Sequence, residues 1–453
     1  MRYEKKRVLV IGMARSGVAA AQLLLSHGAT PLLFDEKKAD AFGDTLQPLE
    51  NTACEFHLGE DAFLLLDQCD AVVISPGVPI DAPIVKAARE QNIPLIGELE
   101  LAFSLLQGEV LAISGTNGKT TTVTLLGKMF ENAGRITHVA GNIGYPLSSV
   151  ALTSKKGDVV VVEVSSFQLE SIRTFHPCVA ALLNITEDHL NRHGTMEQYI
   201  RMKQRMFENQ TAEDVAVLNL DDPVLAKMAE KVRARVAFFS RKQSVQNGAS
   251  VEDGKIVWRW DGVMKPICDA DQILIPGPHN LENALAATAM AASRGVPAAV
   301  IRHTLQSFTG VEHRIEKVRV FEGITYINDS KGTNVDSTIK AVQSMKAPTV
   351  LILGGYDKHT DFAPLCREIV ASGLIAQVVT IGETARQITQ TLEEVGYHHI
   401  TPAYSLEDAV QKSRKLAVSG GNVLLSPACA SFDMFRDYEE RGRVFKALVE
   451  ALH

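Results

Sequence analysis

A glycine-rich stretch at residues 113–121, ISGTNGKTT, carries the residue types that bind phosphate groups. Gly115 and Gly118 allow backbone N–H groups to turn toward phosphate oxygens, and a helix that starts here adds positive partial charge. Lys119 is placed to neutralise the outer phosphates of a nucleotide, and Thr120 is placed to offer a hydroxyl to Mg²⁺. The stretch therefore predicts a phosphate-binding loop.

The flanking segments are the ones that such a loop needs. The apolar run Val110–Ile113 predicts a buried strand, and apolar residues at helical spacing follow the loop at Val123, Leu126, Met129 and Phe130. The match is incomplete, because Ile113 stands where the common pattern has its first glycine. The alternative is a glycine turn before an ordinary helix.

Two further polar clusters follow predicted strands. Glu163 comes directly after the strand 158–162 and downstream of the phosphate loop, which is where a Walker-B acid holds Mg²⁺. The alternative is an acid exposed at a strand end. Asp188 and His189 come after the strand 179–183, where a lone pair of this kind is usually a capped turn. Several such clusters in one domain favour a site.

Lys203 lies on the apolar face of a predicted helix. The stripe at helical spacing comprises Met196, Tyr199, Ile200, Met206 and Phe207. One interpretation is a lysine that snorkels from the edge of this face. The other is a desolvated lysine, whose pKa is lowered so that the neutral amine becomes available.

The N-terminus has a degenerate dinucleotide fingerprint, GMARSG, at residues 12–17. Gly12 and Gly17 fit this fingerprint, whereas Ala14 replaces its second glycine. Asp35 ends the next strand, where an acid would meet a ribose hydroxyl. The segment is interpreted as a nucleotide-binding unit, and the alternative is a plain α/β turn.

Other loops also follow strands or open helices, and ligands gather at the carboxyl ends of parallel strands. Asn280 and Asn283 open an alanine-rich helix, as caps or as nucleotide contacts. The loops after strands have the sequences SPGVP (75–79), NDSKGTN (328–334), GGYDK (354–358) and SPACASFD (426–433).

The length of 453 residues predicts about three domains. A net charge of -7 argues against a nucleic-acid binder, and we find no membrane-spanning run and no signal peptide. Six scattered cysteines without a C-x-x-C pair are expected to be buried thiols of a reduced cytosol. Strands alternating with helices predict an α/β protein of three doubly wound domains: an N-terminal Rossmann-like domain at 1–99, a central P-loop ATPase-like domain at 100–310 and a C-terminal Rossmann-like domain at 311–453.

Taken together, these sequences resemble the Mur ligase family. The resemblance runs in the family's order from Gly12 to Arg443 and is carried by GTNGKTT, EVSSFQLE, NITEDHLNRHG, YIRMKQRMFEN, GPHNLENALAA, HRIE, NDSKGTN, GGYDK and LLSPACASFDMF. The forms SSFQLE and SPACASFD resemble those of the members that add D-glutamate. His359 is a departure, since the family often has glycine there, and it affects the detail of the amino-acid loop.

The resemblance implies an activity. The expected reaction joins D-glutamate to UDP-N-acetylmuramoyl-L-alanine with ATP, through an acyl phosphate, in cytoplasmic peptidoglycan synthesis. Two Mg²⁺ ions and a CO₂-derived carbamate on Lys203 are implied, and the third domain would close over the site. We expect a monomer with small-molecule substrates, no nucleic-acid partner and no transmembrane segment.

The resemblance also implies roles for individual residues. ATP would be bound by Gly115, Thr116, Asn117, Gly118, Lys119, Thr120, Thr121, Asn283, Arg314 and Asp329. The UDP-substrate would be bound by Arg15, Ser16, Gly17, Asp35, Ser75, Pro76, Gly77 and Asn142. The D-glutamate ligands would be Thr333, Lys358, Ser431 and Phe432. The metal ligands would be Thr120, Glu163, His189 and carbamylated Lys203, and the catalytic residues Lys119, Glu163, His189 and Lys203.

Three other interpretations compete with this one. A nucleotide-switch NTPase would bind ATP without joining anything. A glutamate ligase acting on folate is disfavoured by the N-terminal nucleotide unit. A dehydrogenase is disfavoured by Ala14 and by a phosphate loop elsewhere in the chain.

Overall fold

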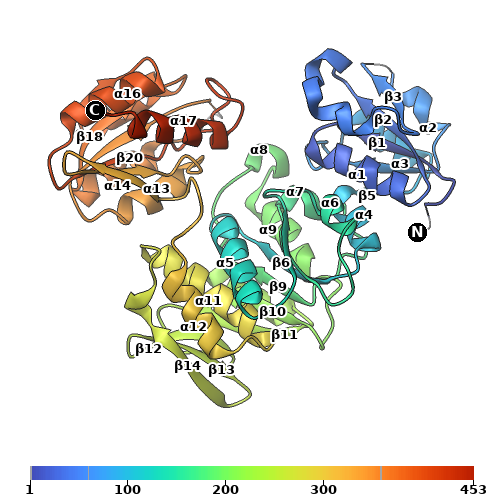
Figure 1. Ribbon diagram of the computed structural model, residues 1–453, viewed down its shortest axis with the longest axis horizontal. Coiled ribbons are helices and arrows are strands. Elements are labelled where there is room, and N and C mark those ends of the chain that lie inside the picture. Colours follow the sequence, from blue (N-terminus) through green and yellow to red (C-terminus); the bar gives the residue numbers. More distant parts are fainter. Residues whose placement is uncertain (1–2, 60, 358–359) are drawn as a thin grey trace. The chain divides into compact units, whose positions relative to one another are not determined.

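A computed structural model describes residues 3–59, 61–357 and 360–453. It contains three sheets, flanked by helices, and confirms the prediction of three α/β domains in series (Figure 1). The chain divides into two compact units. One holds the first two sheets, runs to Ile273 and resumes over Glu282–Ser307, and the other comprises Leu274–Leu281 and the residues from Phe308 onward. The boundaries at 99/100 and 310/311 stay predictions.

The N-terminal sheet has five parallel strands in the order β3-β2-β1-β4-β5. Its strands are β1 (Arg7–Ile11), β2 (Thr30–Asp35), β3 (Glu55–Leu58), β4 (Ala71–Ile74) and β5 (Leu95–Gly97). Its helices are α1 (Arg15–Ser26), the 3₁₀ segment η1 (Ala39–Leu49), α2 (Phe63–Leu66) and α3 (Pro83–Glu90). The central strands are apolar on both faces because helices or loops cover both.

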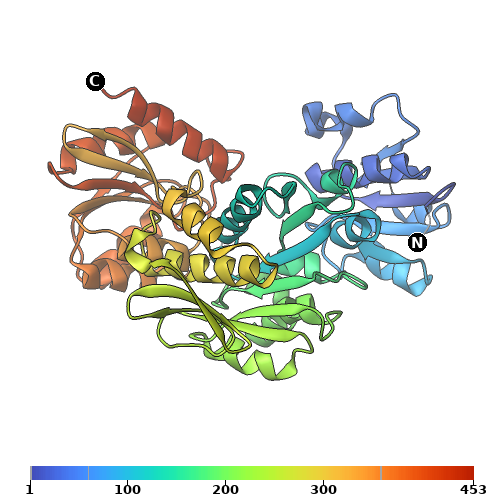
Figure 2. The same cartoon turned by 60° about the horizontal axis from the view of Figure 1, so that its bottom comes forward.

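The central sheet has nine strands in the order β14-β13-β12-β11-β10-β9-β6-β8-β7. These are β6 (Glu109–Ser114), β7 (Thr137–Gly141), β8 (Val159–Glu163), β9 (Val179–Leu182), β10 (Val215–Asn219), β11 (Arg235–Ser240), β12 (Gly248–Glu252), β13 (Lys255–Trp260) and β14 (Val263–Asp269). Only the β12-β13-β14 meander, which Figure 2 brings forward, is antiparallel. A tight turn at Asp253-Gly254 joins β12 to β13.

The central helices are α4 (Glu98–Leu105), α5 (Lys119–Asn132), α6 (Leu147–Ala151), α7 (Ser166–Leu169), α8 (Leu190–His193), α9 (Met196–Gln204), α10 (Pro223–Met228), α11 (Pro278–Ser293) and α12 (Ala298–Ser307). Short 3₁₀ segments are η2 (Arg205–Phe207), η3 (Ala229–Lys231) and η4 (Ala270–Gln272). Thr195 caps α9, since its hydroxyl accepts from the Gln198 amide at 3.3 Å.

The C-terminal sheet has six strands in the order β15-β16-β20-β17-β18-β19, parallel except for β15. They are β15 (Glu316–Phe321), β16 (Ile324–Asn328), β17 (Thr349–Leu353), β18 (Ile375–Thr380), β19 (Ile400–Pro402) and β20 (Asn422–Leu425). Its helices are α13 (Val335–Gln343), α14 (Ala363–Ser372), α15 (Ala385–Glu394), α16 (Leu406–Leu416) and α17 (Tyr438–Glu450).

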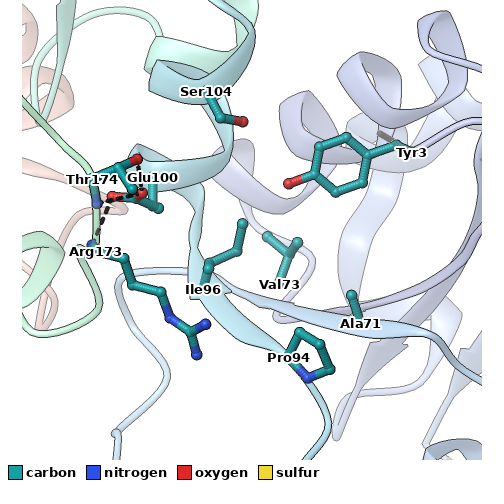
Figure 3. Close-up of a pocket in the computed structure, with 9 residues that line it drawn as sticks. All are labelled: Tyr3, Ala71, Val73, Pro94, Ile96, Glu100, Ser104, Arg173 and Thr174. Atoms are coloured by element: carbon teal, nitrogen blue, oxygen red, sulfur yellow. Dashed lines mark hydrogen bonds between the residues drawn. The ribbon is translucent and has the colours of Figure 1, made fainter. Parts of the chain in front are cut away.

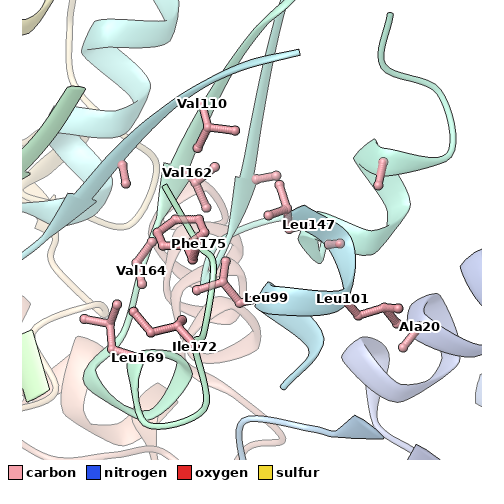
Figure 4. Packing of buried hydrophobic residues seen from close by; sticks show 14 of the residues in the cluster. Ala20, Leu99, Leu101, Val110, Leu147, Val162, Val164, Leu169, Ile172 and Phe175 are labelled. Carbon is pink, nitrogen blue, oxygen red and sulfur yellow. The ribbon is translucent and has the colours of Figure 1, made fainter. Parts of the chain in front are cut away.

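Helix α4 joins the first two sheets through a shared apolar core (Figure 4). Leu101 lies beside Ala20 of α1, whereas Leu99 points toward Phe175 and the β6 and β8 side chains of the central sheet. All of these side chains are buried. The core of the first sheet and that of the second are therefore continuous through α4.

One expectation needs qualification. The six cysteines are free thiols, but only Cys268, Cys366 and Cys429 are buried, and the other three are partly exposed. No helix among the described residues is both long enough and apolar enough to span a bilayer.

Candidate active site

The sheet register brings the predicted site residues of the central domain to one edge. Strand β6 lies between β8 and β9, with Ile113 opposite Glu163 and Ser114 opposite Leu182. The three strands are parallel, so their carboxyl ends meet. The phosphate loop, Glu163 and the segment after β9 are therefore neighbours.

The loop has the backbone that its glycines predict. Gly115 and Gly118 have φ values of 147° and 86°, and a side chain at Gly118 would place its Cβ 2.2 Å from the Asn283 Oδ1 atom. Lys119 opens α5, and its Nζ atom donates to the carbonyls of Gly115 and Thr116 at 2.9 and 2.7 Å. The lysine thus folds back over its own loop.

Residues that follow β9 hold the loop in place. The Asn184 side chain accepts from the Asn117 amide at 2.9 Å and donates to the Asn117 carbonyl at 3.0 Å. The Thr116 hydroxyl contacts the backbone of Thr186 and, at 3.2 Å, the Tyr199 hydroxyl. The sequence analysis gave Asn184 and Tyr199 no role at the loop. In the sequence, only their positions pointed to the site. Asn184 follows a strand, and Tyr199 lies on the helix that carries Lys203.

Glu163 is 2% exposed, which excludes the alternative of an acid exposed at a strand end. One carboxylate oxygen accepts from the Thr120 hydroxyl at 2.8 Å, and the other accepts from the Asn142 side-chain amide at 3.0 Å. Hydroxyl and carboxylate oxygens are the hard ligands that Mg²⁺ prefers. The Thr120–Glu163 pair therefore fits a metal site beside the loop, with Asn142 orienting the carboxylate.

Lys203 is also 2% exposed, so it does not snorkel into solvent. Its Nζ atom donates to the Gly115 carbonyl at 2.8 Å and lies 4.7 Å from the centre of the Tyr199 ring. Burial, and then the neighbouring Lys119 charge, hold the pKa of Lys203 well below its usual value. This is the desolvated amine of the second interpretation.

His189 lies where α8 begins and has a left-handed backbone with φ 55°. Its ring is 4.8 Å from that of Phe167, and its Nε2 atom is 3.6 Å from a carboxylate oxygen of Asp188. The side chain is 42% exposed, so it is open to a substrate. His193, which the sequence analysis did not single out, stacks between Phe167 and Tyr199, and its Nε2 atom lies 2.9 Å from the Ser166 hydroxyl.

In the first sheet, the predicted nucleotide loop is tightly packed. A Cβ at Gly17 would lie 1.9 Å from the Gly12 carbonyl oxygen, so only glycine fits there. Asp35 accepts from the Met13 amide at 2.8 Å, and the Ser75 hydroxyl donates to the Gly12 carbonyl at 2.7 Å. Asp35 and Ser75 thus shape this loop, whatever they bind.

The other residues predicted for the UDP-substrate lie nearby. Arg15 is exposed and Ser16 partly exposed at the start of α1, and Pro76 and Gly77 follow β4. The guanidinium of Arg192, on α8, donates to the carbonyl of Gly77 at 3.5 Å and to that of Val78 at 3.1 Å. Sequence reasoning missed this arginine, which ties the loop after β4 to the segment that holds His189.

In the C-terminal unit, Asp329 is fully buried after β16, and burial raises its pKa. It accepts from the Ser426 hydroxyl at 2.7 Å and from the Ile315 amide at 3.2 Å, with the Arg314 guanidinium 3.8 Å away. Its carboxylate is thus held by its own domain. Asn280 donates to the Pro276 carbonyl at 2.7 Å.

The predicted amino-acid ligands lie on two loops of this unit. Thr333 is partly exposed after β16; Ser431 is buried and Phe432 exposed after β20. The Phe432 ring packs edge-on to Tyr356 with centroids 6.0 Å apart. Lys358 and the departure at His359 lie outside the described residues.

A buried arginine, missed by sequence reasoning, joins these two loops. Arg441 of α17 donates to the carbonyls of Ser330, Cys429 and Ala430 and, through Nε, to the Ser330 hydroxyl at 2.9 Å. Burial lowers the pKa of Arg441 to about 10, so it remains charged at neutral pH. Arg441 lies on a helix of mixed polarity, so the spacing of apolar residues along that helix did not indicate that this arginine is buried.

Comparison with known proteins places this geometry in a family. Residues 6–97 match the Mur ligase MurD-like N-terminal domain, residues 113–291 the Mur ligase middle domain, and residues 313–429 the glutamate ligase domain of Mur ligases.

The chain is also similar to full-length proteins. It is 47% identical over 454 residues to a UDP-N-acetylmuramoylalanine--D-glutamate ligase of Alkaliphilus oremlandii (strain OhILAs), covering 100% of both chains. It is 44% identical to the protein of that name from Clostridioides difficile (strain 630), covering 99% of each. A solved UDP-N-acetylmuramate-alanine ligase of Thermotoga maritima shares the fold, with a TM-score of 0.62 at 18% identity, over 98% of this chain and 99% of that one. With relatives this similar over its whole length, the chain belongs to the Mur ligase family.

Proposed function

We propose that this protein joins D-glutamate to UDP-N-acetylmuramoyl-L-alanine, with conversion of ATP to ADP and phosphate. The observation that carries the proposal is the buried Thr120–Glu163 pair, joined at 2.8 Å directly beside the phosphate loop. A loop of this kind binds a nucleoside triphosphate, and the full-length relatives carry the name of this reaction. The nucleotide-switch alternative has no comparable support from the relatives.

The chemistry would proceed in two transfers. A carboxylate is a poor electrophile, so an oxygen of the L-alanine carboxylate first attacks the γ-phosphorus of ATP, giving an acyl phosphate and ADP. The amine of D-glutamate then attacks the acyl carbon, phosphate leaves, and the amide bond forms. Lys119 would hold the outer phosphates during the first transfer, where several anions meet. The nitrogen must lose a proton in the second transfer, and His189 is proposed to accept it when its imidazole is not coordinated to Mg²⁺.

The residues beside the loop fit two Mg²⁺ ions. Thr120 and Glu163 would hold one, and Glu163, His189 and a carbamate on Lys203 would hold the other. When bound, the ions would screen the negative charges of phosphates and carboxylate. The carbamate is proposed because Lys203 is fully buried beside a second lysine, and addition of CO₂ would turn its amine into an oxygen ligand.

The remaining assignments divide between the sheets. We assign the uridine end of the substrate to the loops after β1, β2 and β4, with Asn142 near the muramoyl-alanine portion. Further ATP contacts are assigned to Asn283, Arg314 and Asp329. D-Glutamate is assigned to Thr333, Lys358, Ser431 and Phe432, because hydroxyls and a cation suit a dicarboxylate. A monomer in the cytoplasm, serving cell-wall synthesis, is part of the proposal.

Phosphate release tests the proposal. The enzyme is incubated with ATP and Mg²⁺, and UDP-N-acetylmuramoyl-L-alanine is combined in turn with D-glutamate, L-glutamate, D-alanine and L-alanine. We expect release only when both co-substrates are present and the amino acid is D-glutamate. Release without any amino acid would instead favour the nucleotide-switch alternative, and release with L-alanine equal to that with D-glutamate would overturn the assignment of substrate.

A further inference from the structure

A cavity of about 170 Å³ lies where the first sheet meets the linker to the second, away from the phosphate loop (Figure 3). Strand β4 and the N-terminal segment contribute one side, β5 the floor, and α4 with the segment before Phe175 the other. These elements belong to one compact unit. None of the residues proposed for the ligase reaction lines the cavity.

Most of the wall is apolar. The side chains of Ala71, Val73, Pro94 and Ile96 form it, and the Tyr3 ring faces them across the space. A cavity of about 150 Å³ with apolar walls accommodates benzene. The apolar part of this cavity therefore has the size and character for one aromatic ring.

Glu100 lies at the polar end but has no capacity left for a ligand. One of its oxygens accepts from the Thr174 amide at 2.7 Å and from the Thr174 hydroxyl, and the other accepts from the amides of Arg173 and Phe175 at 2.8 and 3.0 Å. A carboxylate offers about four acceptor positions, so all of them are used. The carboxylate thus anchors the wall and has no acceptor position left for a ligand's donor.

Apart from Glu100, the polar groups at this end of the cavity are mainly hydrogen-bond donors. Among the described residues, none forms a hydrogen bond or an ion pair with the guanidinium of Arg173, which lies at the mouth of the cavity. Burial raises the pKa of Tyr3, a rise that the neighbouring Ser104 hydroxyl opposes, so the phenol keeps its proton. The Ser104 hydroxyl already donates to the Leu101 carbonyl at 2.7 Å. A ligand here needs an acceptor group, and a guanidinium prefers a carboxylate.

We propose that this cavity binds a small planar aromatic monocarboxylate, with its ring between Tyr3 and the apolar wall and its carboxylate on Arg173. Because the first sheet, the linker and the second domain all line the cavity, the bound molecule contacts all three. Binding to the folded state alone raises the stability of this unit by mass action.

Isothermal titration calorimetry with benzoate tests the proposal. Benzamide, which has the ring but no charge, and acetate, which has the carboxylate but no ring, serve as comparison probes. We expect saturable benzoate binding, benzamide and acetate each at least about tenfold weaker, and a thermal unfolding midpoint that rises with benzoate concentration. Absence of saturable benzoate binding up to the millimolar range, or equal binding of benzoate and benzamide, would overturn it.

Variants separate this site from nonspecific anion binding. Arg173→Gln keeps the backbone amide that holds Glu100 and is expected to weaken benzoate binding about tenfold. The matched control is Arg386→Gln, an exposed arginine of α15 in the other compact unit, which should leave binding unchanged. Ala71→Leu fills the apolar end and should also abolish binding. Equal losses in the Arg173 and Arg386 variants would contradict the proposal.

Discussion

Lys119 and Lys203 donate to the same backbone oxygen, the carbonyl of Gly115, at 2.9 and 2.8 Å. Two ammonium groups on one carbonyl repel each other, and in a buried setting water screens that repulsion poorly. Lys119 is proposed to use its charge to hold phosphates, so relief is expected to come from Lys203. Losing a proton, or gaining a carbamate, removes the conflict.

The first prediction is that Lys203 is carbamylated in the active enzyme. Enzyme equilibrated with ¹³C-bicarbonate should show a carbamate carbon by NMR that is missing in Lys203→Ala. Activity of this variant should fall by at least about 100-fold, because the proposed metal ligand is lost. Acetate should restore part of it by supplying a carboxylate. A fully active Lys203→Ala variant, without any labelled signal in the wild type, would refute carbamylation.

The second prediction concerns stability against pH in CO₂-free buffer. The pKa of Lys203 is lower in the folded than in the unfolded state, so between the two values the unfolded chain binds more protons. Stability contributed by this site therefore rises with pH, by at most about 1.4 kcal/mol per pH unit. Lys203→Met should be more stable than the wild type at pH 7, and the difference should shrink toward pH 9.5. Calorimetry at several pH values measures it, and a constant difference would contradict the lowered pKa.

The third prediction is that Thr120 and Glu163 act as a unit. Thr120→Val and Glu163→Gln should each reduce kcat by roughly 100-fold or more, and the double variant should lose far less than the product of the two losses. Thr124→Val is the matched control, since within the described part of the chain that hydroxyl bonds only to the Thr120 carbonyl, one turn along the helix, at 2.8 Å. If the loss of kcat in the double variant equalled the product of the two single losses, Thr120 and Glu163 would act independently.

The fourth prediction separates loop shape from backbone strain. Gly118→Ala places a Cβ 2.2 Å from Asn283, at φ 86°, and should raise the KM for ATP strongly. Gly134→Ala, at φ 78° with no atom within 4 Å, has only the conformational cost of about 1–2 kcal/mol. It should lower the unfolding midpoint without changing the KM. Similar effects on the KM in both variants would exclude the steric account.

The fold followed from periodicity where strands are buried on both faces. The predicted strands 158–162 and 179–183 agree to within one residue with β8 and β9, because continuous apolar runs mark strands that are buried on both faces. Strand β7 was not predicted. Its sequence, THVAG, has no continuous apolar run, and four of its five residues are only partly buried. Such an edge strand depends on pairing with β8.

The candidate site was predictable where chemistry dictates residue type. Gly115, Gly118, Lys119 and Glu163 stand at strand ends, and the parallel register brings them together. Side chains that hydrogen-bond to the backbone of another segment, such as that of Asn184, have no recognisable pattern in the sequence. Their partners are distant in sequence, so only the folded chain reveals them.

Arg441 holds the loops after β16 and β20 almost entirely through main-chain carbonyls. Main-chain acceptors persist whatever side chains occupy positions 429 and 430. The backbone of these two loops, which are proposed to bind the amino acid, therefore keeps its support when their side chains are mutated. Substrate preference can then change through single substitutions in these loops.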